Sequence, residues 1–157
     1  MRSVVLGVMA ALLGAAPAWA IDVTFTGIVL NTCTLAVPTP GIMTLNSDGK
    51  SLSSDLADGI GVPATLTIIS LGGNSITVGA PTLDTFPVGY STAGQSVQVA
   101  YTGLSGLSGI TQAYTSSQTS FAVGILPLTS LLVNMKIINN NGFKQGTYTG
   151  KTVVTCS

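Results

Sequence analysis

The chain has 157 residues, a length that fits one domain, and only 6% of them are charged, against about 25% in an ordinary soluble protein. Five Lys and Arg balance five acidic residues, and histidine is absent. Without histidine the chain lacks the commonest general base and a frequent metal ligand, so we expect no enzyme activity, no cofactor and no metal site. The zero net charge and the lack of a basic run argue against nucleic-acid binding, which needs cations beside the phosphates.

The first twenty residues have the pattern of a secretory signal peptide. Arg2 precedes an apolar run over 4–16, and Ala18-Trp19-Ala20 supplies the small residues of a cleavage site. The alternative is a membrane anchor, but this run is shorter than the roughly 20 residues that cross a bilayer. We therefore expect an exported protein, in the periplasm, at the cell surface or outside the cell, whose mature chain (21–157) has no membrane span.

Two cysteines, Cys33 and Cys156, lie near opposite ends of this mature chain. An exported chain enters an oxidising compartment, where an even number of cysteines indicates disulfides, and these two allow one internal pairing. The alternative, a redox or metal-binding pair, lacks the close C-x-x-C spacing. The sequence therefore predicts a structural disulfide that holds the first strand beside the last.

Alternation of apolar and polar residues predicts strands almost throughout the mature chain. Strands are expected at 22–37, 64–71, 75–83, 97–101, 119–124, 131–138 and 146–156, with prolines ending the first and a short edge strand over 42–45. Residues 46–63 have the composition of a surface loop, and 103–109 that of an irregular connection. Short strands separated by turns predict an all-β, immunoglobulin-like β-sandwich of about six to eight strands in one domain, 21–157. A closed barrel is the alternative.

Four side chains of the 46–63 loop carry amide or carboxylate oxygens that could bind calcium. Asn46, Asp48, Asp55 and Asp58 match no calcium-loop spacing and lack the terminal glutamate, so an ordinary turn is the preferred interpretation.

Both ends of the predicted domain resemble one family. The segment VTFTGIVLNTC (23–33) is similar to the first strand of bacterial chaperone–usher pilins, which has the form V-x-F-x-G-x-V-x-x-x-C. The segment GFKQGTYTGKTVVTC (142–156) resembles the last strand of spore-coat-U-like and related pilus subunits, in which G-x-Y precedes a Thr/Val-rich strand.

This resemblance implies a sandwich that lacks one strand and accepts it from a periplasmic chaperone or from another pilus subunit. The acceptor groove would then be flanked by Phe25 and Val29 in the first strand and by Tyr148 and Val154 in the last. Two features differ from the family. Cleavage after Ala20 leaves no long donor extension before a strand that begins at 22, and many pilins join their first strand to their second by the disulfide.

We therefore expect a structural or adhesive subunit of a pilus-like or cell-surface assembly that associates by β-strand complementation. The missing donor extension and the different disulfide allow two interpretations. The protein is either a terminal subunit that accepts a strand without donating one or a self-complete relative outside fibre assembly. The alternative function is a stand-alone secreted or periplasmic binding module, which would take a glycan or small ligand through loops 84–96 or 103–118.

Overall fold

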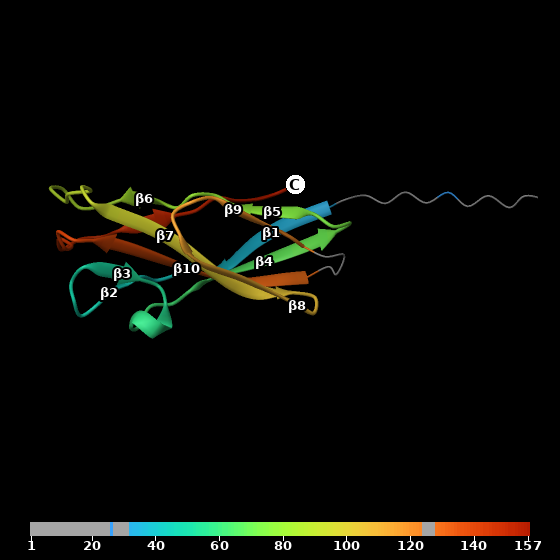
Figure 1. Ribbon diagram of the computed structural model, residues 1–157, viewed down its shortest axis with the longest axis horizontal. Coiled ribbons are helices and arrows are strands. Elements are labelled where there is room, and N and C mark those ends of the chain that lie inside the picture. Colours follow the sequence, from blue (N-terminus) through green and yellow to red (C-terminus); the bar gives the residue numbers. More distant parts are fainter. Residues whose placement is uncertain (1–25, 27–31, 124–127) are drawn as a thin grey trace, which may run out of the picture.

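The computed structural model describes residue 26 and residues 32–123 and 128–157 (Figure 1). This part of the chain is all-β, with one short 3₁₀ helix, η1 (Leu56–Asp58), and no α-helix. The strands are β1 (Thr32–Thr39), β2 (Thr44–Leu45), β3 (Ser51–Ser53), β4 (Ala64–Leu71), β5 (Ser75–Val78), β6 (Thr82–Thr85), β7 (Gln95–Ser105), β8 (Ser108–Thr115), β9 (Thr119–Ala122), β10 (Leu128–Asn139), β11 (Thr149–Lys151) and β12 (Val154–Cys156).

The larger sheet is built around β10, its longest strand. On one side β10 pairs with β7 along nearly its whole length, and on the other side it pairs first with β4 and then with β3. Antiparallel pairing continues outward from β4 to β1, from β7 to β8 and from β3 to β2. The strand β1 therefore forms one edge of this sheet.

The second layer has β5 at its centre, with β9 on one side and β12 on the other, while β6 pairs with β11. The pairing of β5 with β12 and the pairing of β6 with β11 follow one another along the same two segments of the chain. Between these two pairings, the amide of Gly79 donates to the carbonyl of Val153. In consequence, β11 and β12 together form the edge of this layer opposite β9. Figure 1 shows β5, β6 and β9 on one side of the strands of the larger sheet.

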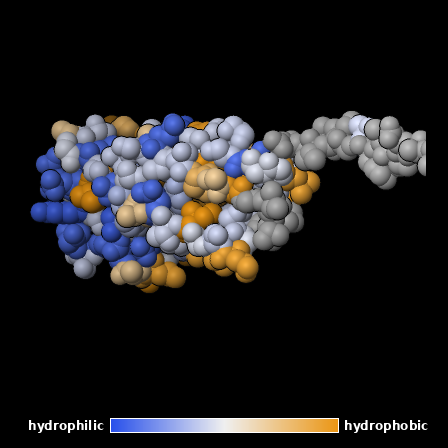
Figure 2. All heavy atoms as spheres, turned by 45° about the vertical axis from the view of Figure 1, so that its right-hand side comes forward, coloured by the Kyte–Doolittle hydropathy of each residue, from blue (hydrophilic) through white to orange (hydrophobic). Residues whose placement is uncertain are grey.

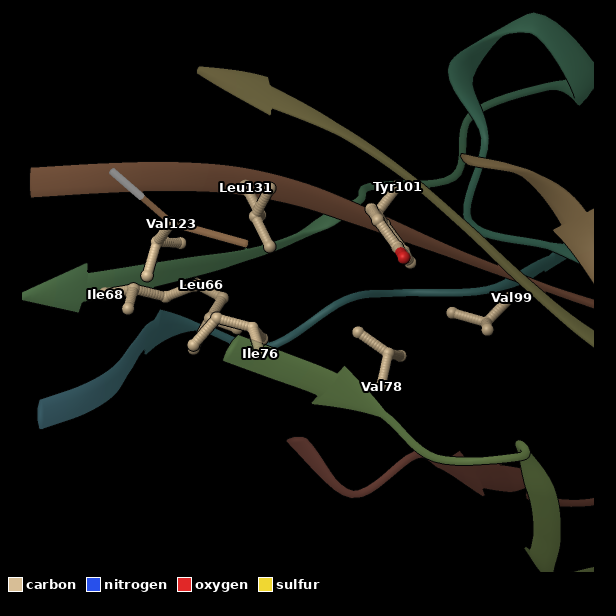
Figure 3. Packing of buried hydrophobic residues seen from close by; sticks show 8 residues of the cluster. All are labelled: Leu66, Ile68, Ile76, Val78, Val99, Tyr101, Val123 and Leu131. Atoms are coloured by element: carbon tan, nitrogen blue, oxygen red, sulfur yellow. The ribbon is translucent and has the colours of Figure 1, made fainter. Parts of the chain in front are cut away.

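The two layers meet in a dry core. Ile76 and Val78 of β5 point toward the larger sheet, where Ile68 of β4, Val99 of β7 and Leu131 of β10 point back (Figure 3). Each of these five side chains is at most 1% exposed. Because alternate strand residues point to one face, this packing confirms the predicted all-β sandwich.

The predicted disulfide is confirmed. Cys33 of β1 is bonded to Cys156 of β12, with the two Cα atoms 6.3 Å apart. It joins residues that are 123 positions apart in the sequence and holds the first described strand beside the last.

Several strand boundaries differ from those expected, so the described residues contain twelve strands. The predicted strands 75–83 and 146–156 are each interrupted, giving β5 with β6 and β11 with β12. Pro38 lies within β1, where the register shifts between Ala36 and Thr39, because an edge strand tolerates a missing amide donor.

Two predictions about loops were wrong. Residues 103–109 are no irregular connection, since β7 reaches Ser105 and β8 starts at Ser108 after a two-residue turn. Gly106 has φ 61°, which a glycine adopts without strain and which such hairpin turns require. The loop expected over 46–63 contains β3 and η1, and β3 is buried beside β10.

The predicted signal peptide (1–20) lies outside the described residues, as do residues 22–25 and 27–31 of the expected first strand. Among the residues that the structure describes, no helix has the length and apolar character that a membrane crossing needs.

Candidate functional site

A groove of about 330 Å³ lies between the edge of the larger sheet at β1 and the edge of the second layer at β11 and β12. We call it the edge groove. Side chains from both layers line it, and most of them are apolar or small: Leu35, Gly41, Met43, Ser54, Ala64, Thr65, Leu66, Val133, Met135, Gly150, Lys151, Thr152 and Val154.

The order of the strands explains why the two layers part here. In the middle of the sandwich β5 covers β4 and β10, and the core is closed. At the side of β1, the larger sheet extends beyond β4, and the strand opposite is the edge strand β12. Leu35 and Val154 point inward from these two edges but are only partly buried, so apolar surface remains accessible in the groove.

The edge at β12 presents backbone groups to a further strand. Ser157 and Ser75 exchange two hydrogen bonds, of 2.7 and 2.9 Å, and the amide of Gly79 donates to Val153. Antiparallel pairing alternates, so residues 153, 155 and 157 turn their backbone groups toward β5, while Val154 and Cys156 turn theirs away from it. These outward amides and carbonyls are the groups with which an added strand would pair.

Two polar side chains of the groove already have partners within the chain. The ammonium of Lys151 lies against the carboxylate of Asp84, and the hydroxyl of Thr152 donates to the carbonyl of Gly79 at 2.7 Å. At Gly150 a Cβ atom would overlap the sulfur of Met135, so the glycine lets β11 approach β10 closely. The groove is therefore suited to apolar side chains rather than to an ion.

The four residues predicted to flank an acceptor groove have different locations. Val154 lines the edge groove. Tyr148 packs edge-on against Tyr90, at 5.1 Å between ring centroids, and against Phe143, at 5.3 Å, at one end of the sandwich. Phe25 and Val29 lie outside the described residues.

Four rings form what we call the end cluster: Phe86 and Tyr90 from the connection between β6 and β7, and Phe143 and Tyr148 from the connection between β10 and β11. Side-chain amides tie these connections together, because Asn139 at the end of β10 donates to the carbonyl of Ser91 and Asn141 donates to the carbonyl of Ala93. Phe86 is 44% exposed, whereas Tyr90 is buried. Figure 2 shows the end of the molecule away from the grey segment as mostly hydrophilic, with apolar residues exposed elsewhere on that face.

A polar network, the Lys136 cluster, joins η1 to the larger sheet. Nζ of Lys136 lies 2.5 Å from Oδ2 of Asp58 and 4.7 Å from the ring centre of Tyr114, whose hydroxyl donates to Asp55. The hydrogen bonds from Lys136 and Ser53 lower the pKa of Asp58. Burial raises the pKa of Tyr114 to about 12.

No local pattern in the sequence marks the Lys136 cluster, because its contacts join residues as far apart as Asp55 and Tyr114. The Lys136 cluster holds Asp55 and Asp58, two of the four candidate calcium ligands, in contacts within the chain. Asp48 accepts a hydrogen bond from the amide of Lys50, as in an ordinary turn. The described residues contain no group of three or more side chains that could hold a metal ion.

Fold and groove together define an all-β sandwich with an open space between one pair of sheet edges. Comparisons of the chain with protein-family models, curated proteins and solved structures gave no match. The immunoglobulin-like topology and the relationship to pilins therefore stay predictions.

Proposed function

We propose that the protein is a non-enzymatic structural or adhesive subunit of a pilus-like or cell-surface assembly, and that it accepts a β-strand from a partner in the edge groove. The observation that carries the proposal is the groove itself, which lies between two strand edges and has apolar side chains from both layers.

Strand addition needs two features, and the groove supplies both. Unpaired backbone groups on an edge strand provide affinity that does not depend on sequence, and pockets for alternate side chains provide specificity. Val154 contributes to both features, since its backbone points away from β5 and its side chain lines the groove.

The sequence adds the setting in which such a subunit would act. The predicted leader directs the chain out of the cytoplasm, and the terminal strands resemble those of chaperone–usher pilins. A periplasmic chaperone or another subunit of the assembly is the expected strand donor.

A labelled peptide with the sequence of residues 22–31 serves as a surrogate donor strand and tests the proposal, because Val23, Phe25 and Val29 give it an apolar face. We expect it to bind the purified full chain, as measured by fluorescence anisotropy. Replacing Ala64, which lines the groove, by Phe should fill the groove and weaken binding at least about tenfold, or about 1.4 kcal/mol.

Ile69→Phe is the matched control, because Ile69 lies on the same strand and is 47% exposed on the opposite face. It should leave binding unchanged. The proposal fails if the wild-type chain binds the peptide no better than a scrambled version, or if both substitutions weaken binding equally.

The exposed ring of Phe86 favours a second candidate function, a binding module for a glycan, because aromatic faces stack on sugars. The end cluster holds this ring beside exposed polar residues of the 84–96 loop, through which the alternative function would bind its ligand. If soluble glycans bind with micromolar affinity, Phe86→Ala should abolish binding, whereas Val88→Ala, at a fully exposed neighbour, should not. Equal glycan binding by the two variants would exclude the end cluster as the glycan-binding site.

A further inference from the structure

We infer that the Cys33–Cys156 disulfide closes one end of the edge groove. An incoming strand ends or turns away beside Val154 and does not pass between the two cysteines. This inference rests on the proposed function and adds to it the length and placement of the strand that the partner supplies.

On both edge strands, the disulfide lies in the same inward-facing row of side chains as the residues that line the groove. On β1, Cys33 and Leu35 are the partly buried positions, while Thr32, Thr34 and Ala36 are exposed. On β12, Val154 and Cys156 are partly buried and Thr155 is exposed. Along the inward-facing row the disulfide therefore comes first, and the pair of Leu35 and Val154, which lines the groove, comes next.

The spacing at the disulfide excludes a strand. Neighbouring strands in a sheet lie about 4.8 Å apart, so a strand inserted between two edges requires them to be about 9.6 Å apart. The Cα atoms of Cys33 and Cys156 are 6.3 Å apart. Since the two Cα atoms of a disulfide rarely exceed about 7 Å, the bond must break before a strand can pass at this point.

The rest of the groove limits the strand to a short segment. Along its edge in the second layer, the groove is lined from Gly150 to Val154, apart from Val153, which faces outward. A strand rises about 3.3 Å per residue, so an occupant paired along this stretch has about five residues, of which two or three point inward. The other end of the groove, at Gly41, Met43 and Gly150, contains no covalent bond between the two edges.

The partner that fits is therefore a protein that offers a short strand, with apolar side chains at two or three alternate positions. A long donor strand of seven or more paired residues does not fit while the disulfide is intact. The bond thus fixes the register of the incoming strand as well as its length.

Amide hydrogen exchange, measured residue by residue by NMR, tests this inference on the full chain. The probe is the peptide of residues 22–31 at saturating concentration, which is long enough to pass the disulfide if nothing prevents it. The amides of Val154 and Cys156 both point away from β5, so each reports whether a strand lies beside it. We expect the peptide to slow exchange at Val154 at least tenfold and to leave Cys156 unchanged.

The variant that carries Cys33→Ser and Cys156→Ser provides the second arm. If it folds, as judged by its amide spectrum, the peptide should slow exchange at position 156 as well as at Val154. If it does not fold, the wild-type measurement decides alone. Equal slowing at Val154 and Cys156 in the wild-type chain, or no effect of the peptide at position 156 in a folded variant, would overturn the inference and leave the proposed function standing. No slowing at either residue in the wild type would refute the proposed function instead.

Discussion

The same two layers face each other in two different ways. In the middle of the sandwich, Ile76 and Ile68 are fully buried and the space between the layers is closed. A few residues away, between Leu35 and Val154, the layers enclose a groove of about 330 Å³. Apolar side chains contribute to both regions, so the presence of apolar residues alone does not separate them.

Strand order makes the difference. In the middle, the strands that bring the core side chains have neighbours on both sides, as β4 has β1 and β10, and β5 has β9 and β12. At the groove, β1 and β12 are both edges, and the disulfide connects them covalently. The two regions together show that a disulfide can hold two sheet edges near each other while the space beside it stays open.

The largest expected effect is loss of that bond. The disulfide closes a loop with a sequence separation of 123, and the chain-entropy model assigns such a loop about 5 kcal/mol. Replacing both cysteines by Ala should therefore lower the free energy of unfolding by about 4–5 kcal/mol in urea titrations. A loss below about 1 kcal/mol would mean that packing already holds the edges together.

A matched pair of valines compares the two regions directly. Val78 and Val154 face each other in the ladder between β5 and β12, but Val78 is 1% exposed in the core, whereas Val154 is partly buried at the groove. Val78→Ala should cost about 2–3 kcal/mol and Val154→Ala about 1 kcal/mol, because only the first leaves a closed cavity. Equal losses in urea titrations would show that the groove side is packed as tightly as the core.

The smallest expected effect concerns the Lys136 cluster, which lies outside both regions. Burial raises the pKa of Tyr114 to about 12, so the folded state holds this proton more tightly than the unfolded state, whose pKa is about 10. The stability it contributes is complete below pH 10 and is lost as the pH rises from about 10 toward 12.

Because Tyr114 is partly exposed, the loss should be on the order of 1 kcal/mol. Tyr114→Phe should remove this pH dependence while keeping the ring beneath Lys136. An unchanged pH dependence in unfolding measurements on the variant would assign the effect to another group.

The features that sequence analysis predicted correctly either follow from a local pattern or allow a single outcome. A β-rich apolar run predicts the strand over 64–71, which β4 matches residue for residue, and two cysteines allow a single internal pair. The hairpin of β7 and β8 was missed because glycine and serine dominate its turn and conceal the strand ends around Gly106.

Burial of β3 was missed for a different reason. Ser54, the residue after β3, exchanges hydrogen bonds with the backbone of Met135, 81 positions away, and Ser53 bonds the carboxylate of Asp58, so the segment is polar in sequence yet inside the fold. The edge groove depends likewise on which strands become edges. Strand order is decided by pairings between distant residues, and no pattern within one strand reveals it.

A crystal structure of the full chain with the peptide of residues 22–31 tests the central claim most directly. The expected result is a peptide strand in the edge groove, paired with the backbone of Val154 and with apolar side chains beside Leu35 and Leu66. A peptide bound at another surface, with the groove between β1 and β12 left empty, would contradict it.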